Sequence, residues 1–157
     1  MKNKRILYLT QASIVAALYV ALSLILPLRF GFVEVRFSEA LCVLPFLMPS
    51  SVWGLFVGCF IVNIFNGSII DVIFGSLATL IGAYIASKIK IKWLCPIPTI
   101  LSNTIIIPFV IMNYSRVWSI SSYLLAAGGV LASEIASVYV IGMILLLALE
   151  KNKLFKR

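Results

Sequence analysis

The chain is dominated by five long runs of apolar residues that contain almost no charge. They cover residues 6–28, 40–70, 72–87, 93–115 and 117–149. A helix needs about 20 apolar residues to cross a bilayer, and each run is close to this length or longer. Hydrophobic residues make up 62% of the 157 residues, whereas soluble domains contain about 45 to 50%. We therefore predict a single integral membrane domain over residues 1–157.

The run 40–70 is too long for one helix. Pro45 and Pro49 favour a break near residue 50, because proline cannot supply its backbone hydrogen bond inside a helix. Ten of the thirteen Lys and Arg residues lie in three clusters, at 2–5, 88–92 and 151–157. With six spans all three clusters face the cytoplasm, as the positive-inside rule requires. The predicted fold is an all-α bundle of six transmembrane helices in the cell membrane, with both termini cytoplasmic.

The formal charge of +8 could also indicate nucleic-acid binding. Membrane topology already accounts for it, so we expect no nucleic acid partner. The basic N-terminus also resembles a signal peptide, but the run 6–28 is longer than a normal signal core and no clear small-residue cleavage site follows it. We expect this run to remain as a span.

Several kinds of chemistry are missing from the sequence. It has no histidine and no GxxxxGK[ST] loop, which argues against a histidine-based hydrolase, an HExxH metal site and ATP hydrolysis by this chain. Cys42, Cys59 and Cys95 lie in apolar runs without metal-ligand spacing, so they are expected to pack as thiols. We predict that the chain is not an enzyme and holds no metal or cofactor. Binding, channel and transport roles remain.

Glu134 is the strongest candidate for a ligand contact. It lies inside the last apolar run, and an ionisable group at membrane depth costs at least about 2.5 to 3.5 kcal/mol on insertion scales. At 1.5 Å per residue it lies about 22 Å from the inner end of its helix, in the outer half of the bilayer. Gly128 and Gly129 leave space beside it. The alternative is a carboxyl group that only bridges two helices.

Four further polar residues are predicted to join Glu134 in a pocket that opens outward. Asn103 lies near the midplane of the fifth span, about 15 Å from its start, whereas Arg36, Glu39 and Asp71 lie at external helix ends. Each has a structural alternative. Asn103 could tie two helices together, Arg36 and Glu39 could pair with each other, and Asp71 could cap its own helix.

Small residues recur at a spacing of four on two helices. This spacing flattens one helix face, so that another helix can approach closely. The close approach could serve internal packing or docking of another membrane subunit. The residues are Ala12, Ala16, Ala17 and Ala21 on the first helix and Gly54 and Gly58 on the third.

Several segments together resemble the QueT family, the substrate-binding S-components of energy-coupling factor (ECF) transporters that take up queuosine precursors. The resemblance covers nearly the whole chain, and its first and third segments are specific. The segments are 33–45 (VEVRFSEALCVLP), 54–63 (GLFVGCFIVN), 71–80 (DVIFGSLATL), 101–108 (LSNTIIIP) and Glu134 followed by Gly142.

The resemblance implies partners and a substrate. An S-component captures its ligand from outside and docks on a transmembrane coupling protein with two ATPases, and the alanine face of the first helix resembles the docking surface. The ligand would be a 7-deazaguanine, such as 7-aminomethyl-7-deazaguanine or queuine. Glu134 would bind the base edge, Asn103 the carbonyl or a ring nitrogen, and Glu39 or Asp71 the 7-substituent, with the loop bearing Arg36 as a lid.

Two other functions stay open from the sequence. The chain could be an S-component for another heteroaromatic vitamin, such as thiamin or riboflavin. It could also be a small channel or a structural membrane protein that assembles through its small-residue faces.

Overall fold

The computed structural model describes residues 2–25, 27–30, 33–66 and 68–151. The first helix, α1, covers Lys2–Ile25, so it begins earlier and ends earlier than the predicted span. Pro27 then starts a short antiparallel hairpin of β1 (Pro27–Phe30) and β2 (Val33–Arg36), in which Pro27 pairs with Arg36. The hairpin stands where we predicted a loop, because proline cannot continue a helical hydrogen-bond ladder.

The long run 40–70 is divided as predicted. A 3₁₀ helix, η1 (Phe37–Phe46), is followed by a turn and then by α2 (Ser51–Asn66). Although η1 has ten residues, the 3₁₀ rise of about 2.0 Å per residue stretches it to about 20 Å. The short second segment therefore reaches further than an α-helix of the same length would.

The remaining chain forms three long helical segments. A π-helical turn, η2 (Asp71–Gly75), continues into α3 (Ser76–Lys88), and a 3₁₀ turn, η3 (Lys92–Leu94), precedes α4 (Ile97–Ser115). The last segment joins α5 (Ile120–Glu134), the π-helical η4 (Ile135–Ile141) and α6 (Gly142–Glu150). The Ser119 side chain caps α5 by accepting a hydrogen bond from the Ser122 N–H at 3.1 Å.

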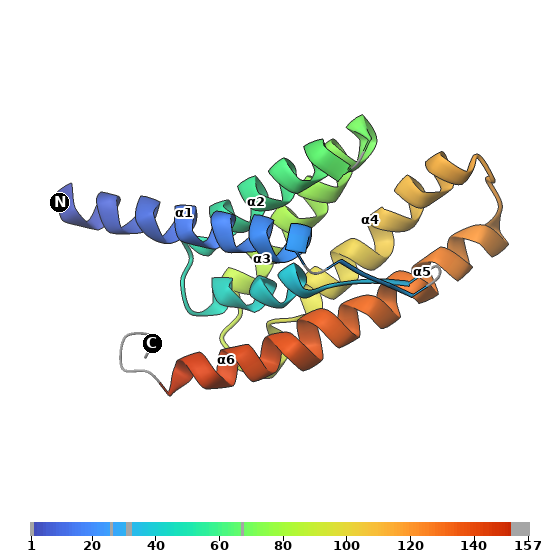
Figure 1. Cartoon of the computed structure of the whole chain (residues 1–157). Coiled ribbons are helices and arrows are strands. Elements are labelled where there is room, and N and C mark those ends of the chain that lie inside the picture. Colours follow the sequence, from blue (N-terminus) through green and yellow to red (C-terminus); the bar gives the residue numbers. More distant parts are fainter. Residues whose placement is uncertain (1, 26, 31–32, 67, 152–157) are drawn as a thin grey trace.

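Six helical segments thus run back and forth along the molecule (Figure 1). Four described helices are long and apolar enough to cross a membrane, and two shorter apolar helices are Phe37–Phe46 and Ser51–Phe65. The start of α1 and the end of α6 lie at the same end of the molecule (Figure 1). Lys92 of η3 forms an ion pair with Glu150 at the end of α6, with 3.2 Å between Nζ and Oε2. The six membrane crossings, and the side of the membrane that this end faces, stay predictions.

The centre of the bundle is η1, whose residues 38–46 are all buried. Segments α1, α2, α3, η4 and α6 all contact it. Gly142 allows α6 to approach η1 closely, since a Cβ there would lie 2.9 Å from Val43 Cγ1 and 3.1 Å from the Ala40 main-chain oxygen. The central position of η1 matters for function because its first turn carries Glu39.

A second close contact joins α1 to α2. A Cβ on Gly54 would lie 2.4 Å from the main-chain oxygen of Ala12, and one on Gly58 would lie 2.8 Å from Tyr19 Cβ. The glycine pair of the third predicted span therefore serves internal packing. Among the described side chains of α1, only Val15 and Tyr19 are buried. The rest of the helix presents half-buried or exposed side chains.

Candidate functional site

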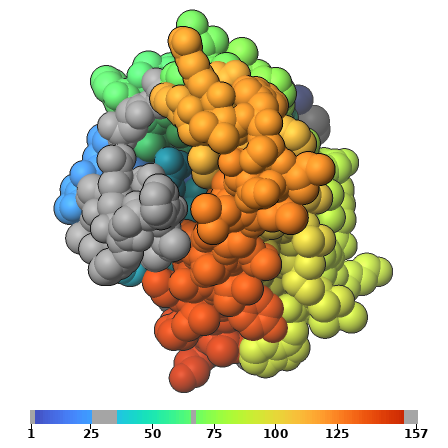
Figure 2. All heavy atoms as spheres, turned by 90° about the vertical axis from the view of Figure 1, so that its right-hand side faces the viewer, coloured from blue at the N-terminus to red at the C-terminus, as the bar shows by residue number. Residues whose placement is uncertain are grey.

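A pocket of about 630 Å³ lies among α1, η1, α2, η2, α4 and α5. It is found toward the end of the molecule away from the start of α1, and Figure 2 looks onto that end. The view shows a hollow beside the orange segments, with green and blue-green segments behind it. All five predicted binding residues line this pocket: Arg36, Glu39, Asp71, Asn103 and Glu134.

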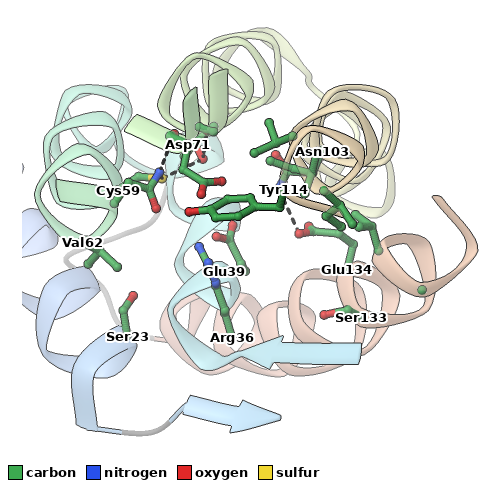
Figure 3. A pocket seen from close by; sticks show the side chains of 18 of the residues that line it. Ser23, Arg36, Glu39, Cys59, Val62, Asp71, Asn103, Tyr114, Ser133 and Glu134 are labelled. Carbon is green, nitrogen blue, oxygen red and sulfur yellow. Dashed lines mark hydrogen bonds between the residues drawn. The ribbon is translucent and has the colours of Figure 1, made fainter. Parts of the chain in front are cut away.

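Asn103 and Glu134 meet across the contact between α4 and α5 (Figure 3). The Asn103 amide donates from Nδ2 to Glu134 Oε1 at 2.9 Å. Asn103 is 4% exposed and Glu134 is 7% exposed. Asn103 Oδ1 and Glu134 Oε2 make no hydrogen bond to the described residues. The predicted interhelical tie is therefore present. It leaves two buried acceptor atoms, on residues that line the pocket, without a partner among the described residues.

Unpartnered buried acceptors are uncommon, because native proteins pair the great majority of such groups. A polar ligand that donated two hydrogen bonds would satisfy both oxygens. The helix that carries Glu134 changes to π geometry directly after it, at Ile135, and the other π-helical turn begins at Asp71. Such turns occur frequently at functional sites.

Glu39 is held in the first turn of η1 by two donors. The Tyr19 hydroxyl donates to Oε1, and the Cys42 thiol donates to Oε2 at 3.2 Å. Arg36 lines the pocket beside it, and Figure 3 shows both side chains pointing into the same region. Both carboxyl oxygens of Glu39 therefore already accept a hydrogen bond from the chain itself.

Asp71 combines the two roles weighed for it. Its Oδ2 accepts from the Ser68 N–H at 3.3 Å, and its own N–H donates to the Ser68 hydroxyl at 3.4 Å. These contacts cap the helix that begins at residue 69 and continues into η2. Asn63 steadies the same turn by donating from Nδ2 to the Asp71 main-chain oxygen at 3.0 Å. The Asp71 carboxylate also lines the pocket, on the side away from Glu134 (Figure 3).

Several lining residues were not predicted from the sequence, of which Tyr114 is the most informative. It is 58% exposed and lies near the end of α4. Figure 3 shows its ring extending across the pocket between Asp71 and Glu134. Tyr114 follows Asn103 at helical spacing, with Ile107 and Ile111 between them on the same lining face. That spacing could have predicted it, whereas Asn63 and Ser133 carried no comparable signal.

The predicted docking residues lie outside this pocket. Ala12 and Ala16 are half-buried, and their main-chain oxygens face Gly54 and Gly58 of α2. Ala17 and Ala21 are exposed. The first pair therefore contributes to packing within the chain, and the second pair lies on a face that is free to meet another molecule.

Comparison with known families matches the model of the QueT transporter over residues 9–151. The chain belongs to the QueT transporter family. The matched range includes all of the pocket residues, so the QueT family assignment covers the site as well as the fold. No curated protein and no solved structure matches the chain. As a QueT transporter family member with several long apolar helices, it is a multi-pass membrane protein with a transport role rather than an enzyme.

Proposed function

We propose that this chain is the S-component of an ECF importer and that it binds a 7-deazaguanine precursor of queuosine. The observation that carries the proposal is the buried Asn103–Glu134 pair, whose Oδ1 and Oε2 atoms are unpartnered in a pocket wall. The family resemblance supplies the class of ligand, and the pocket supplies the chemistry that such a ligand needs.

The size of the pocket suits a base. Small-molecule sites usually occupy about 300 to 1,000 Å³, and this pocket has about 630 Å³. A bicyclic base is planar, so it can stack on an aromatic ring. Tyr114 offers such a ring from α4, whereas Ile107 and Val110 add apolar surface.

The two open acceptors match one edge of the base. A 7-deazaguanine presents a ring N–H beside an exocyclic amine, and these neighbouring donors can bond to Glu134 Oε2 and Asn103 Oδ1. This arrangement changes one predicted role, because the Asn103 amide nitrogen already donates to Glu134. Asn103 then acts mainly as an acceptor toward the base.

The partners follow from the same proposal. A coupling protein and two ATPases supply the energy, in keeping with the absence of a GxxxxGK[ST] loop from this sequence. The pocket faces outward, both termini are cytoplasmic, and the hairpin that ends at Arg36 closes over the ligand. The exposed part of the alanine face, Ala17 and Ala21, meets the coupling protein.

Calorimetry on the purified protein tests the ligand. We expect 7-deazaguanines to bind and thiamin or riboflavin not to bind. Binding of thiamin or riboflavin without binding of 7-deazaguanines would identify the chain as an S-component for another vitamin. Ion conductance without binding of any of these compounds would indicate a channel. Co-purification with a coupling protein and ATPases tests the assembly separately.

The variant Glu134→Gln tests the site itself. The glutamine amide replaces one carboxyl oxygen by an NH₂ donor, and a buried donor that is left unpaired costs about 1 to 3 kcal/mol. We expect affinity for the 7-deazaguanine to fall about tenfold to a hundredfold. Glu150→Gln is the matched control, because it makes the same chemical change at the Lys92 ion pair outside the pocket. Unchanged affinity in Glu134→Gln would remove this residue from the site.

A further inference from the structure

We propose that a groove between α3 and α4 binds a membrane phospholipid with an anionic headgroup. The acyl chain lies in the groove, and the phosphate lies against Lys88 and Lys90 at its end. Among the described residues, this groove and the pocket that contains Glu134 share none of their lining residues. The inference therefore goes beyond the proposed function and does not depend on which solute the chain transports.

The α3–α4 groove is apolar and has the size of a binding site. Its volume is about 420 Å³, and small-molecule sites usually occupy about 300 to 1,000 Å³. Ser102 is the one polar residue among its described lining residues, and the Ser102 hydroxyl donates to the Ala78 main-chain oxygen at 2.9 Å. The exposed side chains that form its walls are Ile81 and Ile85 of α3 and Ile97 and Leu101 of α4.

A close contact between the two helices forms the base of the groove. A Cβ on Gly82 would lie 2.6 Å from Thr99 Cα and 2.7 Å from Ser102 Oγ, so α3 and α4 pack tightly there. Gly82, Thr99 and Ser102 are buried, whereas the side chains of the walls are exposed. The groove is therefore shaped by the packing of the chain itself, before any occupant arrives.

The lining favours a lipid chain over a helix of a partner protein. Helices in membranes associate closely through small residues, which let their backbones approach. The exposed and half-buried residues that line this groove are isoleucine, leucine and proline. The segments that form it, Asp71–Lys88 and Lys92–Ser115, are each long and apolar enough to cross a membrane. In a bilayer, acyl chains therefore surround the open side of the groove.

Two lysines at the end of the groove supply positive charge for a headgroup. Lys88 is the last residue of α3, and Lys90 follows Ile89, which itself lines the groove. Both lysines are exposed, and neither forms an ion pair with an acidic residue in the described part of the chain. Lys92 differs, because it is paired with Glu150. Basic sites between transmembrane helices on the cytoplasmic side are typical of anionic-lipid binding.

Aromatic residues mark the same region as a membrane interface. Lys88 Nζ lies 5.3 Å from the centre of the Tyr84 ring, and Lys92 Nζ lies 5.7 Å from the centre of the Trp93 ring. Both rings are exposed, and Trp and Tyr are enriched where acyl chains meet headgroups. A lipid whose chain fills the groove therefore has its phosphate at the height of Lys88 and Lys90. The proposed topology places this end in the cytoplasmic leaflet, which carries anionic lipid.

Native mass spectrometry of the purified protein in detergent tests the charge. It compares phosphatidylglycerol with phosphatidylcholine that carries the same acyl chains. We expect phosphatidylglycerol to bind the wild type at least about tenfold more tightly, because each lysine beside an anionic lipid contributes about fivefold. Lys88→Gln/Lys90→Gln should lower this ratio to near one. Lys4→Gln/Arg5→Gln removes two charges from α1 instead, and it should leave the ratio close to that of the wild type.

A second comparison tests the groove. Leu101→Trp places an indole between the walls, so both lipids should bind at least about fivefold more weakly. Ile144→Trp is the matched control, since Ile144 is exposed on α6 and does not line the groove. Melting temperatures check that both proteins are folded. If Leu101→Trp does not fold, Ile85→Trp makes the same change from the wall formed by α3.

Three results would overturn the proposal. Equal binding of the two lipids to the wild type would remove the preference for an anionic headgroup. An equal loss of this preference in Lys4→Gln/Arg5→Gln would show that overall charge, and not the groove, selects the lipid. Unchanged lipid binding in a folded Leu101→Trp protein would show that the acyl chain lies elsewhere. If that variant also failed to co-purify with a coupling protein, the groove would be a protein interface instead.

Discussion

A carboxyl group among apolar helices needs hydrogen-bond partners, and Glu134 obtains one from Asn103 while its other oxygen has none among the described residues. The two interpretations of Glu134, a tie between helices and a ligand contact, are therefore compatible. The tie orients the carboxylate and restricts its rotamers, so less entropy is lost when a ligand binds. The same logic applies to Glu39, which Tyr19 and Cys42 hold in place before any ligand arrives.

Tyr114 provides a prediction at the same scale. Removal of its ring in Tyr114→Ala should weaken binding of the 7-deazaguanine about fivefold to a hundredfold, because stacking of a base on an aromatic side chain contributes about 1 to 3 kcal/mol. Tyr114→Phe keeps the ring and is the control, with an expected affinity close to that of the wild type. Calorimetry on both proteins decides the matter. Equal affinity for Ala and Phe at this position would show that the ring is not part of the site.

At the scale of elements, the sequence predicted the helices well and their finer geometry poorly. Apolar runs and basic clusters carry the information on helix number, because length and charge control membrane insertion. The 3₁₀ geometry of η1 and the π turns after Ile70 and Glu134 depend on packing around the pocket. No residue pattern encodes that packing locally. The hairpin was missed for a similar reason, since its strands have only four residues each.

For the site as well, the sequence predicted which residues take part but not how they contact one another. An acidic residue inside an apolar run is visible in the sequence, so Glu134 could be found. Glu39 and Asp71 could be found because both lie near helix starts that were predicted to face the same side of the membrane. The hydrogen-bond direction between Asn103 and Glu134 could not be found in this way. It depends on how α4 and α5 approach each other, which only coordinates reveal.

The contact between α1 and α2 gives a prediction about stability. Gly54→Ala would place a methyl group 2.4 Å from the main-chain oxygen of Ala12, so the helices must separate. Overpacking of this kind typically costs about 1 to 3 kcal/mol, and we expect a lower melting temperature in detergent. The matched control is Gly128→Ala, where the added Cβ meets no atom within 4 Å. A Gly54→Ala protein that melts at or above the wild-type temperature would contradict the close contact.

At the scale of the whole molecule, α1 differs from the other long helices because it packs on the bundle along one side only. This helix packs mainly on α2 and leaves most of its length exposed, although residues 3–25 are long and apolar enough to cross a membrane. Helices in lipid gain little from burial of apolar surface alone, so close association depends on small residues that let backbones approach. Ala17 and Ala21 provide such a surface on the exposed side of α1. Neither Ala17 nor Ala21 lines the pocket, so ligand binding and the proposed docking can be tested separately.

That separation leads to a prediction for transport. Ala17→Trp should block uptake of the 7-deazaguanine while binding by the purified protein stays within about twofold of wild type, because the indole prevents close approach of the coupling protein without reaching the pocket. Ala17 is a better test than Ala16, whose main-chain oxygen already faces Gly58 inside the chain. Leu125→Trp is the control, since Leu125 is 74% exposed on α5 and lies outside the proposed docking face. Uptake by cells that carry the complete transporter, measured beside calorimetry, distinguishes the two steps. Normal uptake in Ala17→Trp would exclude this face of α1 from docking, and loss of binding would show that α1 also shapes the pocket.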